Sequence, residues 1–155
     1  MRNESRFFII LMLAADDEER VACPLNQLDG NRKRHGRWQW RHPNGQLGED
    51  HFYVHGERHG LWQWRHADGQ LWQECTYERN QWHGVWRQWD KRGQLREEST
   101  YEKGQWHGLS RWWDKRGQLR EEGTYEKGQL HGVWREWDAN GQLREEGTYE
   151  KGKLQ

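Results

Sequence analysis

Short runs rich in aromatic and β-branched residues alternate with polar, glycine-containing turns along most of the chain. In one unit, residues 85–89 and 94–101 have the composition of strands, and they are separated by a turn at residues 90–93 and followed by a turn at residues 102–104. Glycine recurs about every 8–12 residues, so an apolar stripe with helical spacing cannot develop. The pattern predicts β-hairpins that are joined in a meander.

This hairpin unit recurs five times with a fixed period of 24 residues. Every copy has a His-Gly pair, a Gly-Gln-Leu triplet and a tyrosine at equivalent positions; the tyrosines are Tyr53, Tyr77, Tyr101, Tyr125 and Tyr149. A fixed period of this size marks a repeat array, in which each unit buries its apolar face only by stacking on the next. We therefore expect an all-β fold, an elongated single-layer twisted sheet of about five stacked β-hairpin repeats over residues 31–155.

In one strand of the unit, the alternation of apolar and polar side chains places a charged residue on the apolar face. Leu95 and Tyr101 are six residues apart and are expected on one face, with the small side chain of Ser99 leaving room for a tryptophan ring from a neighbouring strand. Glu97 has the same parity, which does not suit a buried face. Either the strand bulges near Glu97, or this face is an open, hydrated groove.

Composition points to an aromatic core. Leu, Ile, Val and Phe make up about 14% of the chain, below the ~20% level that signals disorder when net charge is high. The net charge is zero, however, and 13 tryptophans each offer on the order of 200 Å² of surface to bury. Lys and Arg total 25 and Asp and Glu total 25, so no basic excess favours a nucleic-acid partner. The fine alternation of charge predicts a solvated face with cross-strand ion pairs.

The first 30 residues lie outside the array. Residues 7–15 are apolar and too short to span a bilayer, so residues 1–15 are expected to be a signal peptide or, alternatively, a helix that caps the first repeat. The compartment is therefore left open between cytoplasmic and secreted or periplasmic. Cys23 and Cys75 can form a disulfide if the protein is exported, although the repeat does not require a thiol at residue 75.

The sequence contains no arrangement typical of catalysis or metal binding. Equivalent histidines such as His83 and His107 are expected two strands apart, about 9.6 Å, whereas two nitrogens on one zinc lie within ~3.5 Å. The carboxylates recur on a flat charged surface, and no nucleophile elbow, phosphate loop or metalloprotease helix is present. We expect no enzyme activity, no cofactor and no metal.

The recurring motif resembles the MORN repeat, and more closely its bacterial variant found in antitoxin-like proteins. One full copy has Gly-Gln-Leu at residues 117–119, Tyr-Glu-Lys-Gly at residues 125–128 and His-Gly at residues 131–132. Arg32 and Asn80 depart from the motif because they replace the glycine of the second turn. The resemblance implies stacked hairpins in a non-enzymatic module that binds proteins and, in some members, membrane lipids.

We expect a non-catalytic repeat scaffold that mediates protein–protein interaction, with an antitoxin-like role as one form of it. The alternative is an extracytoplasmic binder of cell-wall glycan or membrane lipid headgroups through exposed aromatic rings. Either function would use the same anchors unless these rings are core only; the candidates are Trp86, Trp89, Tyr101, Trp112, Trp113, Tyr125, Trp134 and Trp137. A spacing of three, as between Trp86 and Trp89, places two rings on opposite faces unless a bulge intervenes. The edge of the last strand is expected to allow self-association.

Overall fold

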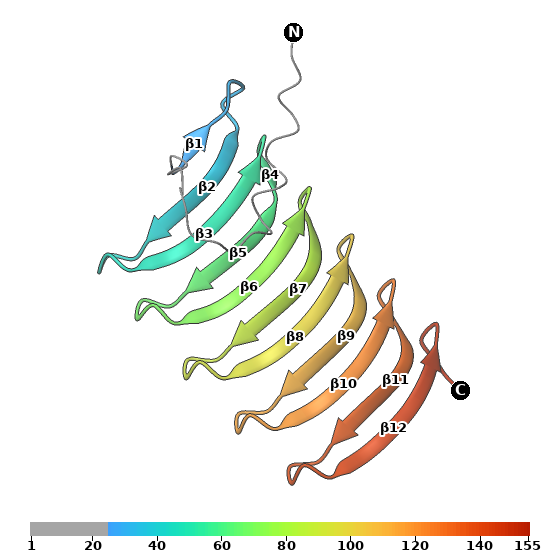
Figure 1. Ribbon diagram of the computed structural model, residues 1–155. Helices are drawn as coiled ribbons and strands as arrows, with labels where there is room; N and C mark the ends of the chain where they lie inside the picture. Colours follow the sequence, from blue (N-terminus) through green and yellow to red (C-terminus); the bar gives the residue numbers. More distant parts are fainter. Residues whose placement is uncertain (1–24) are drawn as a thin grey trace, which may run out of the picture.

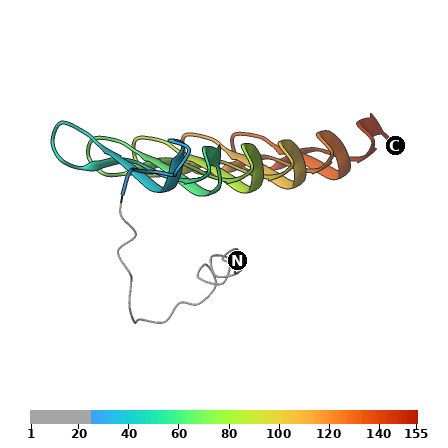
Figure 2. The same ribbon diagram turned by 90° about the horizontal axis from the view of Figure 1, so that it is seen from above.

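The computed structural model describes residues 25–155, which form one open antiparallel sheet (Figure 1). Consecutive strands lie side by side in chain order, except that the short β4 pairs with β3 off this path. The sheet is a single layer when seen from above (Figure 2). The strands are β1 (Gln27–Leu28), β2 (Arg34–Arg41), β3 (Leu47–Val54), β4 (Glu57–Arg58), β5 (Gly60–Arg65), β6 (Leu71–Glu78), β7 (Gln81–Trp89), β8 (Leu95–Glu102), β9 (Gln105–Trp113), β10 (Leu119–Glu126), β11 (Gln129–Trp137), β12 (Leu143–Glu150) and β13 (Lys153–Leu154).

The predicted all-β array of stacked hairpins is confirmed. The first strand, β1, lies ahead of residue 31, inside the segment that we expected to precede the array. The expected signal peptide or cap at residues 1–15 lies outside the described residues, and so does Cys23. Within residues 25–155, no helix is long and apolar enough to cross a membrane.

The second turn of each unit is a two-residue reversal with both residues in the left-handed region. Lys103 has φ 50° and Gly104 has φ 79°, while the flanking Glu102 and Gln105 are paired across the hairpin. Positive φ at both central residues matches the right-handed twist of the strands. Where Asn80 replaces this glycine, it adopts φ 69°, as asparagine tolerates better than most residues.

The first turn of the later units is held by an aspartate. Asp90 Oδ1 accepts hydrogen bonds from the backbone N–H groups of Arg92 at 2.8 Å and Gln94 at 3.0 Å. The bond from Gln94 is the main reason why the pKa of Asp90 is lowered. Such side-chain bonds to the local backbone stabilise the reversal without a partner from another repeat.

A bulge in β8 resolves the conflict at Glu97. Trp89 pairs with Leu95 and Gln88 pairs with Glu97, so Arg96 is an extra residue with no partner on β7. The expectation that Leu95 and Tyr101 share a face was therefore wrong, because the bulge breaks the alternation between them. The equivalent irregularity recurs between β2 and β3, β5 and β6, β9 and β10, and β11 and β12.

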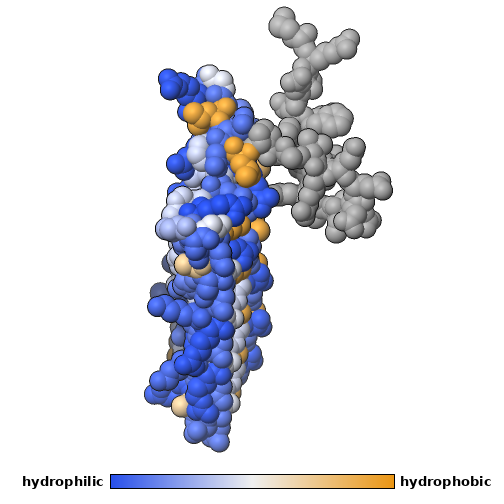
Figure 3. Space-filling view, turned by 90° about the vertical axis from the view of Figure 1, so that its left-hand side faces the viewer, coloured by the Kyte–Doolittle hydropathy of each residue, from blue (hydrophilic) through white to orange (hydrophobic). Residues whose placement is uncertain are grey.

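The two faces of the sheet have different chemistry. We call the face that carries the five repeat tyrosines the aromatic face, and the face that carries Arg87, Glu98 and their equivalents the ion-pair face. Trp86 is directly opposite Ser99 on the aromatic face, while the adjacent Arg87 points to the ion-pair face. The side of the molecule seen in Figure 3 is mostly hydrophilic, with small separate hydrophobic patches.

The buried core lies on the aromatic face of the first repeats. It consists of Tyr53, Trp62, Cys75 and Tyr77, with Cys75 only 1% exposed and without a disulfide partner among residues 25–155. Burial raises the pKa of the Cys75 thiol to about 11, so it remains protonated near neutral pH. Ser99 is fully buried beside Trp86, which agrees with the expected need for a small residue there.

The two ends of the sheet are finished differently. At the N-terminal end, β1 pairs with part of the free edge of β2. The Asn26 side chain bonds to the same edge: its Oδ1 accepts a hydrogen bond from Gln39 N at 2.8 Å, and its Nδ2 donates one to Gln39 O at 3.3 Å. At the other end, β13 pairs only with Tyr149 and Glu150 of β12. Self-association through the β12 edge stays a prediction, and light scattering of the concentrated protein tests it.

Candidate functional site: the aromatic face

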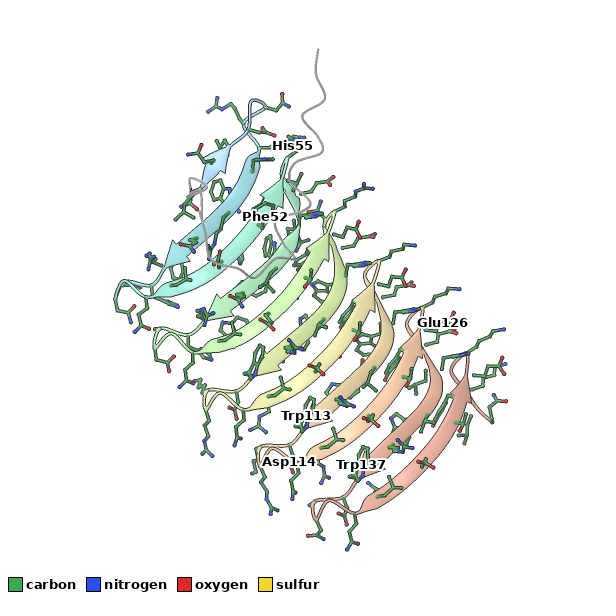
Figure 4. All side chains as sticks on the ribbon, viewed as in Figure 1. Phe52, His55, Trp113, Asp114, Glu126 and Trp137 are labelled. Carbon is green, nitrogen blue, oxygen red and sulfur yellow. The ribbon has the colours of Figure 1, made fainter. Side chains whose placement is uncertain are left out.

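The structure divides the eight predicted anchors between the two faces. Because side chains alternate along a strand, the aromatic face carries one group and the ion-pair face the other. The first group consists of Trp86, Tyr101, Trp112, Tyr125 and Trp134, and the second of Trp89, Trp113 and Trp137. The bulge beside Trp89 lies on the partner strand β8, and the irregularity of β7 itself lies before Trp86, so a spacing of three does place Trp86 and Trp89 on opposite faces. Trp113 and Trp137 lie at the strand ends beside the aspartate turns (Figure 4).

The rings of the aromatic face form a continuous row across four strands. The ring centroids of Trp82 and Tyr101 are 5.0 Å apart, those of Tyr101 and Trp106 are 6.4 Å apart, and those of Trp106 and Tyr125 are 4.9 Å apart. Trp106 Nε1 also donates a hydrogen bond of 2.5 Å to Tyr101 Oη. Each of these rings is partly exposed. Trp82 and Trp106 were absent from the predicted set, although their shared repeat position after the second turn was a signal for them.

Carboxylates lie among the rings of the later repeats. Glu97 is directly opposite Trp112, and Ser99 Oγ donates to Glu97 Oε1 at 3.3 Å. Burial raises the pKa of Glu97. One repeat further on, Glu121 accepts a hydrogen bond of 2.8 Å from Trp134 Nε1. The aromatic face is therefore anionic as well as apolar in this half of the sheet.

Three carboxylates of this face are aligned across β10, β11 and β12. Glu136 is directly opposite both Glu121 and Glu145. Like charges directly opposite each other on neighbouring strands destabilise a sheet. Arg144 Nη1 contacts Glu136 Oε1 at 2.9 Å, which balances one of the three charges.

The first repeats place cations on the same face. The Arg34 guanidinium lies 4.7 Å from the Trp38 ring centroid and 5.3 Å from that of Tyr53, and it donates a 2.8 Å hydrogen bond to Tyr53 Oη. Arg58 lies 4.6 Å from the centroid of Tyr77 and donates to Tyr77 Oη at 3.2 Å. Arginines thus lie over the ring pairs of the first two repeats, whereas carboxylates lie beside the indoles of the later repeats.

The ion-pair face is satisfied by its own charges. Arg87 contacts Glu74 at 3.0 Å on one neighbouring strand and Glu98 at 2.6 Å on the other. Arg135 bridges two further strands in the same way, through Glu122 at 3.4 Å and Glu146 at 2.5 Å. These cross-strand pairs agree with the solvated charged face that the alternation of charge predicts, and they leave few unpaired charges for a partner.

Histidines of the His-Gly pairs each lie near a single carboxylate. His107 Nε2 is 3.5 Å from Glu102, and His131 Nε2 is 3.7 Å from Glu126, which lies at the rim formed by the second turns (Figure 4). Among residues 25–155, no three His, Cys, Asp or Glu side chains gather as a set that could hold a metal ion. The surface is suited to contacts through rings and charges.

Comparison with known families agrees with this architecture. The sequence model of the family described as MORN repeat variant matches five segments of 22 residues each: 34–55, 58–79, 82–103, 106–127 and 130–151. Each segment begins near the start of one strand, contains the first turn of a unit, ends inside the second turn, and carries one repeat tyrosine. The match covers more than half of the chain, so the protein belongs to the MORN repeat variant family.

The family defines the class of protein. This chain is a MORN-type repeat scaffold, and MORN repeat proteins are generally non-catalytic. No curated protein matches the sequence. The likeness to the variant found in antitoxin-like proteins stays a prediction, because the family match does not distinguish that group.

Proposed function

We propose that the protein is a non-catalytic scaffold that binds a partner protein on its aromatic face. The observation that carries this proposal is the row of partly exposed rings from Trp82 through Tyr101 and Trp106 to Tyr125. Trp and Tyr are enriched at the centres of protein interfaces, where they bury large rigid surfaces. The ion-pair face is less suited to binding a partner, because its charges already have partners within the chain.

Two adjacent residues of β12 allow a face-specific test. Glu145 lies on the aromatic face and Glu146 on the ion-pair face, and both side chains are exposed. A photo-crosslinking amino acid is placed at one position or the other, and the protein is irradiated in extracts of its native cells. We expect a crosslinked partner from residue 145 and much less from residue 146. Equal crosslinking from both positions, or crosslinking only from residue 146, would contradict the proposal.

An antitoxin-like role is a special case of this function, in which the crosslinked partner is a toxin. Binding of cell-wall glycan or lipid headgroups is the second candidate, since stacked rings also bind sugars and quaternary ammonium groups. That candidate requires export, so determination of the mature N-terminus separates the two. A protein that retains Met1 in the cytosol favours the protein partner.

A further inference from the structure

One aromatic pair near the C-terminal end copies a pair near the N-terminal end. The ring centroids of Trp38 and Tyr53 are 6.2 Å apart with an interplanar angle of 75°. Those of Trp134 and Tyr149, four repeats later at equivalent positions, are 6.3 Å apart at 80°. The two pairs therefore offer the same ring geometry.

The N-terminal copy shows which chemical group this geometry accepts. The guanidinium of Arg34 lies over both rings and donates a hydrogen bond to the tyrosine hydroxyl. The next repeat repeats the arrangement with Arg58 over Trp62 and Tyr77. A planar cation is attracted by the ring faces, and its N–H groups reach the hydroxyl oxygen in the same pose.

The C-terminal copy has no such cation from the described part of the chain. Leu130 occupies the repeat position of Arg34 and Arg58, and no Lys or Arg of residues 25–155 lies over Trp134 or Tyr149. A carboxylate lies beside the tryptophan of the pair instead. Glu121 accepts the hydrogen bond from the Trp134 indole, and Glu136 lies directly opposite Glu121 on β11.

We infer that Trp134 and Tyr149, together with the carboxylate of Glu121, bind an arginine side chain of a partner protein. This inference rests on the proposed function and names the chemistry of the partner. Arginine suits the site better than lysine because its planar fork both stacks on rings and pairs with carboxylates. The bound cation also relieves the repulsion between carboxylates that lie in line on neighbouring strands.

The test uses an unstructured peptide of alternating glycine and arginine with a fluorescent label. Its neutral control replaces every arginine with citrulline, which keeps the shape and removes the charge. We expect anisotropy titrations in physiological salt to show at least tenfold weaker binding of the citrulline peptide. A peptide with lysine in place of arginine is expected to bind severalfold more weakly.

A substitution within the protein can fill the site with a guanidinium of its own. Leu130→Arg installs the residue that the first two repeats carry, so the new guanidinium should lie over Trp134 and Tyr149 and weaken binding of the arginine peptide at least tenfold. Leu130→Met is the matched control and should bind as the unchanged protein does. Glu121→Gln should weaken binding severalfold without loss of the β-sheet circular dichroism spectrum.

Equal binding of the arginine and citrulline peptides would overturn the inference, and so would full binding by both Leu130→Arg and Glu121→Gln. The proposed function is contradicted by a different result, namely crosslinking from residue 146 that equals or exceeds crosslinking from residue 145. If residue 145 captures a partner while the arginine peptide does not bind, the scaffold proposal stands and the arginine site does not.

Discussion

His51 is stacked on Trp62, with the ring centroids 3.9 Å apart and the planes 13° from parallel. The position of His51 in the repeat is taken by Cys75, Ser99 and glycine in later units, so the imidazole is the largest group placed there. Its exposed fraction is 9%, and burial is the main reason why its pKa falls to about 4. The neutral imidazole is thus part of the packed aromatic face.

This stacking predicts an acid-sensitive contribution to stability. The pKa of His51 is lower in the folded state, at about 4, than the ordinary 6.5, so between these values the unfolded state binds more protons and stability falls as pH falls. From pH 7 to 4.5 the loss from His51 is on the order of 2–3 kcal/mol. His51→Ser, which installs the residue found at Ser99, should lose less stability over this range in urea denaturation. Carboxylates titrate in both proteins, so an identical pH dependence would contradict the assignment.

The Arg87 ion pairs predict a modest, salt-dependent contribution. Arg87 and Glu98 are 2.6 Å apart on a solvated face, where such a pair stabilises a protein by about 0.2–1 kcal/mol. A double-mutant cycle with Arg87→Met and Glu98→Gln should give a coupling energy in this range by chemical denaturation. The coupling should shrink in 1 M salt because exposed charges are screened. A coupling that is unchanged by salt would mean that packing, rather than charge, holds the two side chains together.

The second turn predicts a clear penalty for an added side chain. Gly104 has φ 79°, so Gly104→Ala should lower the free energy of unfolding by about 1–2 kcal/mol. Nothing lies within 4 Å of a Cβ at Gly104, so the expected loss of stability comes from the backbone conformation and not from a steric clash. Gly30→Ala is the matched control, because that position is equally open and has no positive φ. Equal effects of the two substitutions in thermal or urea unfolding would refute the turn assignment.

The crowded centre of the aromatic face predicts intolerance to larger residues. A Cβ at Gly123 would lie 3.1 Å from atoms of both Leu130 and Trp134, so Gly123→Val should destabilise the protein by about 1–3 kcal/mol through overpacking. Thr124→Val, on the adjacent residue and the opposite face, should change stability much less. Near-equal effects would show that the ring packing around residue 123 is loose.

The sequence alone was enough to predict the fold, because turn chemistry and alternation recur in every unit with one period. Local rules place both turns of the third unit, and Asn80 serves in place of the turn glycine. The bulge at Arg96 was one of two alternatives, because the conflict at Glu97 indicates either an extra residue in the strand or a hydrated face, and the pairing of Trp89 with Leu95 decides between them. That bulge decides the face of Leu95.

The arrangement of the aromatic face was predicted in part, for a related reason. Trp86 and Trp134 could be named as anchors because tryptophan is rare and conspicuous in a strand pattern. Arg34 and Arg58 could not be assigned a role, because their contacts with the tyrosine rings join residues that are 19 positions apart. The alignment of Glu121 with Glu136 likewise depends on register across β10 and β11.

Equivalent residues of successive repeats lie two strands apart, which corresponds to about 9.6 Å at the ordinary spacing of strands. An extended polypeptide advances about 3.3 Å per residue, so three of its residues match one unit of the array. In the polyproline II conformation the advance is about 3.1 Å per residue with three residues per turn, so a ligand of this form laid along the long axis would meet chemically comparable surroundings at every third side chain. The spacing between such positions is set by the backbone hydrogen bonds between strands. The side chains at each position are set by the individual repeat.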